Sequence, residues 1–476
     1  MSTVKKNYIF NLLLTGFNIL FPVISFPYAA KILGPVGIGK VQFILSFTQY
    51  FALIAALGIP IYGVRVISQS AHDSKLVYKN LGELLSIHIF CSLFITALYI
   101  VVVLSFPFFH SEKTLYILSG LIILMSFSSV DWYFSGIEDF KLIAIRSVSV
   151  KILSLICLFL FVKVKADYNI YLIISLVSIL GNNIINIVSI ARHVSISYKG
   201  IKKHIKPLAY TFGTTVATSM YTMLDTILIG FFADDKAVGL YSASIKLTKI
   251  SIPLILSAGA VLMPRISKLF ASQDAEVLKL ILNKAFNYVV ILAVPVCIGL
   301  LFLAPQLIYV FSGIQFNEAI LTMQILSPLA LIIGLGNFWG FQILIPAGKE
   351  REVLISVVLG MIFNLSLNCI MIPVYKQNGA AVANVISELI VTSAYMFFCF
   401  RVINFKISHK PILFNLLACV PFIIIVLFFR TLNLNAYCFL GVSAILFVAS
   451  YFVIQLKLIK NSVLNELLGA YLSKSK

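Results

Sequence analysis

The stretch LLSIHIFCSLFITALYIVVVLSFPF, residues 84–108, contains no Asp, Glu, Lys or Arg. A helix of about 20 apolar residues is long enough to cross the hydrocarbon core of a bilayer. Because lipid offers no water to unpaired backbone N–H and C=O groups, an uninterrupted apolar run of this length indicates a helix and not a strand of a membrane barrel. The stretch therefore predicts a transmembrane helix.

Similar apolar runs fill the chain from end to end, with only short polar connections between them. They predict an all-α polytopic membrane protein with about 14 transmembrane helices. The predicted spans are residues 9–32, 41–64, 84–108, 115–135, 142–162, 169–191, 208–232, 238–264, 285–304, 319–345, 353–373, 379–400, 411–429 and 436–456.

The composition agrees with a protein that lies almost wholly in the membrane. Of its 476 residues, 61% are hydrophobic and only 11% are charged, which leaves no room for a soluble domain. The net charge is +19, but the basic residues lie at predicted helix ends, so we expect no nucleic-acid partner. The seven cysteines all lie in apolar runs without C-x-x-C spacing, so we expect neither disulfides nor a metal site.

The distribution of Lys and Arg predicts the orientation of the chain. If the N-terminus is cytoplasmic, most of the 36 basic residues lie in inner segments and few lie in outer loops or inside spans. Cytoplasmic loops of membrane proteins are enriched in Lys and Arg. With an even number of spans, both termini are therefore expected in the cytoplasm.

The longest polar stretch, residues 192–207, lies between the sixth and seventh predicted spans. A weak internal repeat with an offset of 200 residues matches Gly39 with Gly239 and Arg65 with Arg265. Two six-span units with the same orientation would be related by an axis along the membrane normal and would enclose a central cavity. The predicted divisions are an N-lobe at 1–198, a cytoplasmic linker at 199–207, a C-lobe at 208–404, and a C-terminal helix pair with its tail at 405–476.

Five charged residues inside the predicted spans are the main candidate site residues. A charge at a helix centre costs roughly 2.5–3.5 kcal/mol on insertion scales, so each needs a physical reason. Lys246 and Lys249 are three residues apart in the eighth span and therefore share one helical face. With Lys151 in the fifth span, they would form a cationic cavity that binds an anionic substrate. Asp225 and Glu388 are candidates for ion coupling; alternatively, either acid pairs with a lysine and joins two helices.

Other polar candidates lie at helix ends or within the spans. Arg65 and Arg265 lie at predicted cytoplasmic helix ends, where an arginine usually anchors the helix at the headgroup level. Their matched positions in the repeat also suit contact with a phosphate at the cytoplasmic mouth of the cavity, because a guanidinium group binds phosphate with two hydrogen bonds. The amides that we expect to bond helix to helix are Asn182, Asn183, Asn186, Asn364, Asn368 and Asn384.

The chain shows no arrangement typical of an enzyme. It has no H-E-x-x-H, P-loop or G-x-S-x-G motif, and its six histidines are scattered over several connections and one span. A hydrolase or metal site would need such side chains to converge. We therefore expect no catalytic activity and no cofactor.

Five segments carry a resemblance to a known family. They are LGPVGIG at 33–39, DWYFSGIE at 131–138, DTILIG at 225–230, AVGLYS at 237–242 and PAGKER at 346–351. The second is similar to the family signature W-x-F-Q-G-x-E, although Ser135 stands where the family commonly has Gln. With the 14-span pattern, these segments make the chain resemble the Wzx-type oligosaccharide flippases of the multidrug/oligosaccharidyl-lipid/polysaccharide (MOP) exporter superfamily.

The resemblance implies two six-helix lobes that alternate between inward-open and outward-open states, with helices one, two, seven and eight around the cavity. It also implies that an undecaprenyl-diphosphate-linked oligosaccharide moves from the cytoplasmic to the periplasmic leaflet of the bacterial inner membrane, for O-antigen, capsule or exopolysaccharide synthesis. The expected partners are this substrate, membrane lipids and other membrane proteins of polysaccharide assembly. Lys246 and Lys249 lie in the eighth span, so the charge pattern and the resemblance indicate the same two residues.

Four alternatives stay open. A lipid II flippase of the same superfamily shares the substrate charge and the two extra helices. A drug/cation antiporter typically has a carboxylate in its first span, which this chain lacks. A membrane-embedded polymerase or ligase would need a large outer loop, and a proton-pumping respiratory subunit would show inverted repeats.

A transporter with equal affinity on both sides only equilibrates its substrate, so directed transport needs either a coupled H⁺ or Na⁺ gradient or removal of the product.

Overall fold

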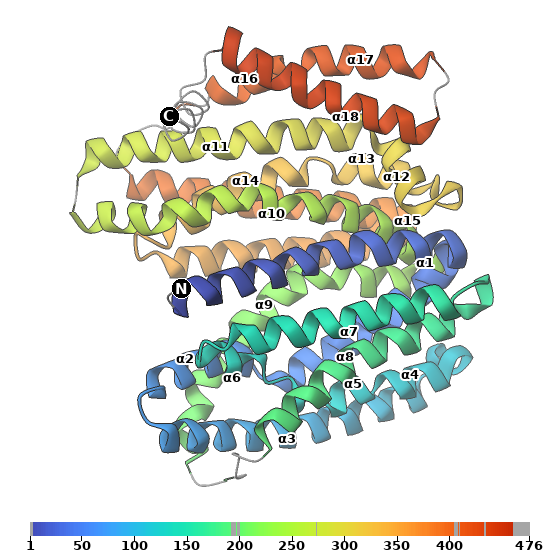
Figure 1. Ribbon diagram of the computed structural model, residues 1–476, viewed down its shortest axis with the longest axis vertical. Coiled ribbons are helices and arrows are strands. Elements are labelled where there is room, and N and C mark those ends of the chain that lie inside the picture. Colours follow the sequence, from blue (N-terminus) through green and yellow to red (C-terminus); the bar gives the residue numbers. More distant parts are fainter. Residues whose placement is uncertain are drawn as a thin grey trace. The chain divides into compact units, whose positions relative to one another are not determined.

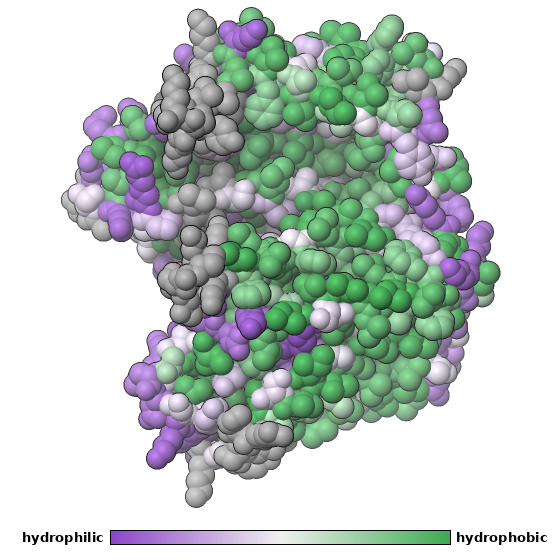
Figure 2. Space-filling model, viewed as in Figure 1, coloured by the Kyte–Doolittle hydropathy of each residue, from purple (hydrophilic) through white to green (hydrophobic). Residues whose placement is uncertain are grey.

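The fold consists of helices. The computed structural model describes residues 3–191, 197, 200–272, 274–403, 408, 410–432 and 435–459, and every secondary-structure element within these ranges is helical (Figure 1). The all-α fold predicted from the apolar runs is therefore confirmed. Figure 2 shows hydrophobic side chains over most of the visible face, with hydrophilic ones toward the margins where many helices end. Such a surface is typical of a multi-pass membrane protein.

Packing divides the chain into two compact units, unit 1 (Met1–Gly239) and unit 2 (Leu240–Lys476). Unit 1 contains α1 (Thr3–Ala56), α2 (Ile59–Ser70), α3 (Ser74–Ser105), α4 (Lys113–Ser119), α5 (Leu121–Leu124), α6 (Asp131–Gly136), α7 (Phe140–Phe161), α8 (Tyr168–Ile190) and α9 (Lys202–Phe232), with the short 3₁₀ turns η1 (Pro107–Glu112), η2 (Ser126–Ser128) and η3 (Lys165–Asp167).

α10 (Asp235–Ser272) begins in unit 1 and continues into unit 2. Unit 2 also contains α11 (Ala275–Phe302), α12 (Ala304–Ser312), α13 (Ala319–Leu326), α14 (Leu329–Trp339), α15 (Glu350–Val402), α16 (Lys410–Ala418), α17 (Val420–Arg430) and α18 (Ala436–Val453), with the short turns η4 (Ile314–Phe316), η5 (Gly340–Leu344) and η6 (Ile454–Leu458). The division into membrane lobes at residues 198 and 208 stays a prediction.

α1 consists of two helical segments, because its backbone breaks at Gly34. A straight helix of 54 residues would be about 80 Å long, more than twice the thickness of a bilayer core. Gly34 has φ 69° and ψ 178°, a conformation open to glycine and disfavoured for other residues, and Pro35 follows it. Figure 1 shows the chain reversing within α1. The break lies between the predicted spans 9–32 and 41–64.

α15 is also two segments, with non-helical backbone at Lys376 (φ 49°, ψ −128°). A Cβ atom added to Gly379 would come within 2.4 Å of the carbonyl oxygen of Met371. Eight residues of straight helix would separate these positions by about 12 Å, so the chain folds back between them. This reversal lies between the predicted spans 353–373 and 379–400.

Nine described helices are long and apolar enough to cross a membrane, or up to eleven if each of two bent helix pairs counts as one span. The pairs are Pro107–Leu124 with Ser126–Gly136, and Asp235–Ser257 with Leu262–Phe270. This count rests on length and composition, and it takes α1 and α15 as one helix each. The chain is thus a multi-pass helical protein with at least nine candidate spans among the described residues.

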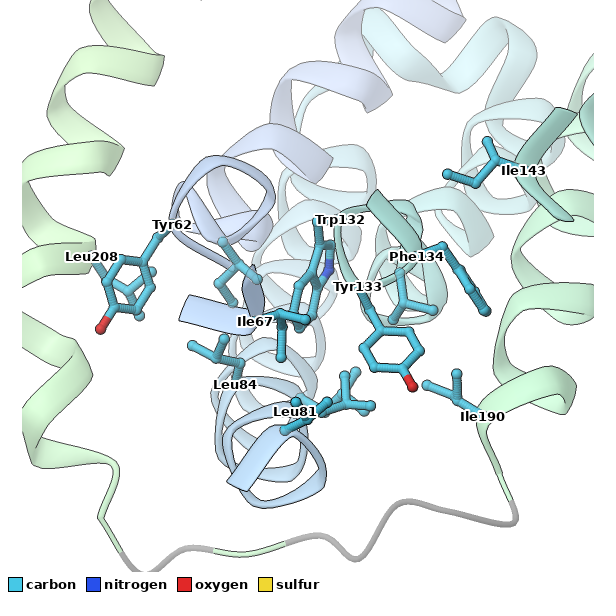
Figure 3. Close-up of a cluster of buried hydrophobic side chains, with 14 residues drawn as sticks. Tyr62, Ile67, Leu81, Leu84, Trp132, Tyr133, Phe134, Ile143, Ile190 and Leu208 are labelled. Carbon is cyan, nitrogen blue, oxygen red and sulfur yellow. The ribbon is translucent and has the colours of Figure 1, made fainter. Parts of the chain in front are cut away.

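The segment that resembles a family signature, residues 131–138, packs α6 against α2 in the core of unit 1 (Figure 3). The ring of Trp132 covers Gly63, where an added Cβ atom would come within 2.3 Å of the indole. Gly136 faces Ile67 in the same way, and an added Cβ atom would lie 2.7 Å from the Ile67 side chain. Two glycines, one on each helix, therefore allow the close approach that this segment requires.

Candidate functional site

Lys151 is half-buried on α7, facing α1. Its ammonium group donates a hydrogen bond to the side-chain oxygen of Asn18 and lies 5.8 Å from the ring centroid of Phe21. No carboxylate among the described residues forms an ion pair with it. The positive charge of Lys151 is thus not neutralised by a carboxylate of the described residues.

A cavity of about 290 Å³ lies beside Lys151, between α1, α7 and α8. Its lining holds several hydroxyl groups and one amide but no Asp or Glu. The lining residues are Phe21, Ser25, Lys151, Ser154, Leu158, Tyr171, Ile174, Ser175, Ser178, Ile179 and Asn182. We call this cavity the Lys151 pocket. Figure 2 shows hydrophilic side chains that interrupt the hydrophobic surface near the place of α7 in Figure 1.

A buried arginine that the sequence patterns did not indicate borders this region. The Arg146 side chain on α7 is only 4% exposed and pairs with Asp131 at the start of α6. Arg146 also donates to the side-chain oxygens of Asn182, at 3.3 Å, and Asn186. Asn186 donates to Asp131 at 2.9 Å. The prediction that Asn182 and Asn186 bond helix to helix is therefore confirmed.

Lys246 and Lys249 lie in unit 2, on α10. Lys246 is half-buried and Lys249 is exposed, and both have interaction partners. Glu388 is half-buried on α15 in the same unit, whereas Asp225 is buried on α9 in unit 1, with 3% of its surface exposed. The three-residue spacing keeps the two lysines on one face of the helix. Their role in binding substrate, and that of the two acids in ion coupling, stay predictions.

Arg65 and Arg265 are both exposed, although Arg65 lies in the interior of the short helix α2 and not at its end. Arg65 lies on α2, and its guanidinium carbon is 5.5 Å from the ring centroid of Tyr62. Arg265 lies near the end of α10 in unit 2. Exposure is compatible with both predicted roles, headgroup anchor and phosphate contact.

A second polar cluster, also outside the sequence predictions, surrounds the fully buried carboxylate of Glu83 on α3. Lys203 and His204, at the start of α9, place their side-chain nitrogens 2.7 and 2.9 Å from Glu83 Oε2. The Tyr62 hydroxyl lies 2.8 Å from His204 Nδ1. Burial lowers the pKa of His204, although its hydrogen bond to Glu83 opposes the shift. Lys203 and His204, which lie in the segment predicted as a cytoplasmic linker, thus fasten the start of α9 to α2 and α3.

α1 touches the junction of α9 and α10 through glycines. A Cβ atom added to Gly39 would come within 1.6 Å of the carbonyl oxygen of Asp235, and one added to Gly239 within 1.9 Å of that of Pro35. Nearby, Lys40 pairs with Glu112, which also accepts a hydrogen bond of 2.8 Å from a tyrosine hydroxyl, that of Tyr168 on α8. The backbone contact thus joins α1 to the α9–α10 junction, and the ion pair joins α1 to η1.

Unit 2 contains an apolar cavity of about 460 Å³ between α10, α11, α12 and α18. Its lining has a single polar side chain, that of Tyr451. The Tyr451 hydroxyl lies within hydrogen-bond distance of two acceptors, the carbonyl oxygen of Ile291 at 2.9 Å and the side-chain oxygen of Asn415. The lining residues are Leu254, Ile291, Leu292, Pro295, Val296, Gly299, Leu300, Leu307, Phe447, Val448, Tyr451 and Phe452. Such a surface suits a hydrocarbon chain.

Sequence comparisons relate the chain to transport proteins. Residues 4–270 match a family model described as Polysaccharide biosynthesis protein, and residues 211–370 match one described as MatE. A protein from Shigella dysenteriae, named an O-antigen transporter, is 26% identical over 396 residues, which are 82% of this chain and 98% of that protein. A protein of the same name from Escherichia coli K12 is 22% identical over 406 residues, or 83% and 96% of the two chains.

Solved structures show the same fold. The lipid II flippase MurJ in an inward closed conformation aligns with a TM-score of 0.78 at 18% identity, over 94% of this chain and 98% of that chain. An inward-facing multidrug resistance transporter of the MATE family aligns with a TM-score of 0.61 at 16% identity, over 80% of this chain and 94% of that chain. The chain therefore shares the fold of these two transporters.

Proposed function

Because the chain belongs to the polysaccharide biosynthesis protein family, we propose that it is a flippase for undecaprenyl-diphosphate-linked oligosaccharides. It would move repeat units from the cytoplasmic to the periplasmic leaflet of the bacterial inner membrane, for O-antigen, capsule or exopolysaccharide synthesis. The observation that carries the proposal is the similarity to the Shigella dysenteriae O-antigen transporter, which extends over 98% of that protein.

The charge inside the helical region supports this substrate class. A diphosphate and a sugar chain do not cross hydrocarbon unaided, because the membrane interior cannot replace their hydration. Lys246, Lys249 and Lys151 supply cations at positions within apolar helices. In this proposal they bind anionic groups of the substrate, and Arg65 and Arg265 receive its phosphates at the cytoplasmic side.

The apolar cavity of unit 2 suits the other end of the same substrate. Its lining between α11 and α18 offers hydrocarbon surface without competing hydrogen-bond donors, so a polyprenyl chain would lose little by leaving the lipid. The C-terminal helix α18 then has a function as one wall of a lipid-binding surface. A drug-sized cation would find no carboxylate in the lining of this cavity with which to form an ion pair.

We propose 14 transmembrane spans with both termini in the cytoplasm. The upper count of eleven becomes 13 when α1 and α15 are each taken as two segments, because each breaks near its middle. The apolar end of α9, Met223–Phe232, supplies one more. Single cysteines at 202 and 236 would test this topology: label should reach 202 only from the cytoplasm and 236 only from outside. The opposite pattern would contradict it.

Alternating access assigns a role to the contact between Gly39 and the α9–α10 junction. In the proposed topology this contact lies at the periplasmic end, so it seals that side while the cytoplasmic side is open. Opening to the periplasm must separate the two backbones. Directed transport further needs a difference between the two states, from an H⁺ or Na⁺ bound near Asp225 or Glu388, or from removal of the product.

Reconstituted flipping tests the proposal. Purified protein in proteoliposomes should move fluorescent undecaprenyl-diphosphate oligosaccharide between leaflets, and its binding of the lipid diphosphate should weaken with salt. The matching MatE model at residues 211–370 makes a drug/cation antiporter the competing function. Efflux of cationic dyes without any binding of the lipid diphosphate would favour that antiporter and overturn the proposal.

A further inference from the structure

Three helices of unit 1 turn polar faces toward the Lys151 pocket. On α8 the lining residues Tyr171, Ser175, Ser178 and Asn182 follow one another at steps of four, three and four, which places them on one face of the helix. α1 contributes Ser25 one turn beyond Phe21, and α7 contributes Ser154 one turn beyond Lys151. A polar stripe on three lipid-embedded helices is costly unless it meets a polar partner.

Several of these groups lack that partner within the described chain. The hydroxyls of Ser25, Tyr171 and Ser178 make no hydrogen bond with any described residue, although Ser25 and Tyr171 are only 6% and 9% exposed. Ser154 and Ser175 donate to the backbone of their own helices, at 2.9 Å each, and keep their lone pairs available as acceptors. The pocket therefore offers donors and acceptors that await a ligand rich in hydroxyl groups.

The charge of the pocket indicates that the ligand is an anion. Among the described residues, Asn18 is the one hydrogen-bond acceptor for the three ammonium protons of Lys151, and the lining contains no carboxylate. The neighbouring Arg146 is already paired with Asp131, so it does not compensate Lys151. A carboxylate or phosphate bound at Lys151 would supply the missing negative charge.

The size of the pocket excludes the smallest anions as a good fit. A cavity of about 290 Å³ has room for many water molecules, since one water needs only about 10–15 Å³ of a cavity measured in this way. A halide would leave most of the space unfilled, whereas one sugar ring is of suitable size. The aromatic rings of Phe21 and Tyr171 add apolar surface against which the C–H face of such a ring can pack.

We propose that the Lys151 pocket binds one acidic sugar residue, of the hexuronate class, in the glycan that the protein carries. The sugar carboxylate pairs with Lys151, and its hydroxyls bond to the serines of α1, α7 and α8. The inference rests on the proposed function, because it makes the flippase selective for repeat units that contain an acidic sugar. The diphosphate of the lipid carrier presents the same anionic chemistry, so the experiment separates the two sources.

Binding of soluble probes to the purified full-length protein in nanodiscs provides the first arm. D-glucuronate, D-glucose and inorganic pyrophosphate are titrated by ligand-observed NMR. Glucuronate should bind about tenfold more tightly than glucose, the difference typical of one charge-assisted contact. Lys151→Gln should abolish this preference and Lys151→Arg should retain part of it. Lys141→Gln is the matched control, because Lys141 is exposed on the same helix.

Two results would overturn the inference. One is equal binding of glucuronate and glucose by the wild-type protein. The other is pyrophosphate binding that depends on Lys151 but does not displace bound glucuronate. That result would assign the pocket to the lipid diphosphate. A Ser25→Ala/Ser178→Ala variant keeps the test valid if Lys151→Gln fails to fold: it should weaken both sugars equally and leave the preference for glucuronate intact.

Flipping in proteoliposomes separates this inference from the proposed function. Wild-type protein should flip acidic repeat units faster than neutral ones. Lys151→Gln should abolish this ratio of the two rates, whereas the control Lys141→Gln should keep it. Flipping without any acid preference would end the inference and leave the proposed function standing. Lys151-dependent glucuronate binding by a protein that flips no lipid-linked glycan would end the proposed function and leave the pocket as a sugar-acid site.

Discussion

Gly39 and Gly239 are 200 positions apart in the sequence, yet their backbones are in contact: a Cβ atom on Gly39 would lie 3.0 Å from the amide nitrogen of Gly239. The same atom would lie 1.6 Å from the carbonyl oxygen of Asp235, which leaves no room for any side chain. The two glycines are also partners in the internal sequence repeat. The repeat thus pairs positions that meet in space, at the end of unit 1 that the proposed mechanism must open and close.

Replacement of Gly39 by Ala should therefore prevent this contact. The methyl group would collide with backbone atoms, which cannot rotate away as a flexible side chain would. We expect flipping to fall by about tenfold or more, with label at position 236 reacting faster from outside. The measurement is proteoliposome flipping with cysteine accessibility.

Gly16→Ala on the same helix is the control, because a Cβ atom there meets nothing within 4 Å. It should flip at the wild-type rate. If Gly39→Ala flipped as fast as Gly16→Ala, the glycine contact would have no part in the transport cycle.

The ion pair of Arg146 and Asp131 predicts an asymmetric effect on stability. The Arg146 side chain is 4% exposed, whereas that of Asp131 is 53% exposed. Asp131→Asn leaves a buried guanidinium without its counter-ion and should cost about 3 kcal/mol, while Arg146→Gln leaves a carboxylate that water can still reach and should cost less. Thermal unfolding in detergent compares the two variants.

The double variant Asp131→Asn/Arg146→Gln provides the check on this pair. It carries no charge at either position, so it should unfold at a higher temperature than Asp131→Asn alone. If both single variants were equally destabilised and the double variant were no more stable than Asp131→Asn, Asp131 would not act as the counter-ion of the buried Arg146.

The sequence predicted the helical class well and the polar sites only in part. Hydrophobicity alone identifies helices in lipid, because no other open structure satisfies the backbone there. The breaks at Gly34 and Lys376 both fall between predicted spans, because an apolar run ends at each place. The close packing of Gly379 against Met371 follows only from the structure.

The sequence did not predict that Arg146 and Glu83 are buried, and the physical reason is the same for both. Both lie close to the ends of apolar runs, where a charge usually reaches water or headgroups, and only the packing of neighbouring helices makes them buried. The polar stripe of α8 was detectable: its residues repeat at helical spacing in an apolar run. Which helices face that stripe, and hence the Lys151 pocket, follows only from tertiary structure.

The contacts of His204 predict how stability depends on pH. Neutral His204 satisfies both neighbours, since Nε2–H donates to Glu83 and Nδ1 accepts from the Tyr62 hydroxyl. Because burial lowers the pKa of His204, the unfolded chain takes up a proton at a higher pH than the folded chain does. This contribution to stability is present above a pH of about 6.5 and is lost as the pH falls below it. Thermal unfolding between pH 8 and pH 5 measures the loss.

His204→Gln tests the assignment, because Gln cannot titrate. The variant should be less stable than the wild type at pH 8, and the difference should shrink toward pH 5. His72→Gln is a suitable control, since His72 is exposed. Identical pH profiles of His204→Gln and the wild type would exclude His204 as the titrating group.

The sharpest prediction concerns Lys246 and Lys249. If they bind the substrate diphosphate, replacing both with Gln should nearly abolish flipping while the yield of folded protein stays close to normal, because Gln keeps hydrogen-bonding capacity without the charge. Replacing both with Arg should retain part of the activity, since the charge survives although its geometry changes. If instead a lysine joins two helices through an acid such as Glu388, the Gln variant should lose folded protein and recover it with Glu388→Gln. A stable Gln double variant that flips at the wild-type rate would show that these two lysines do not bind the substrate.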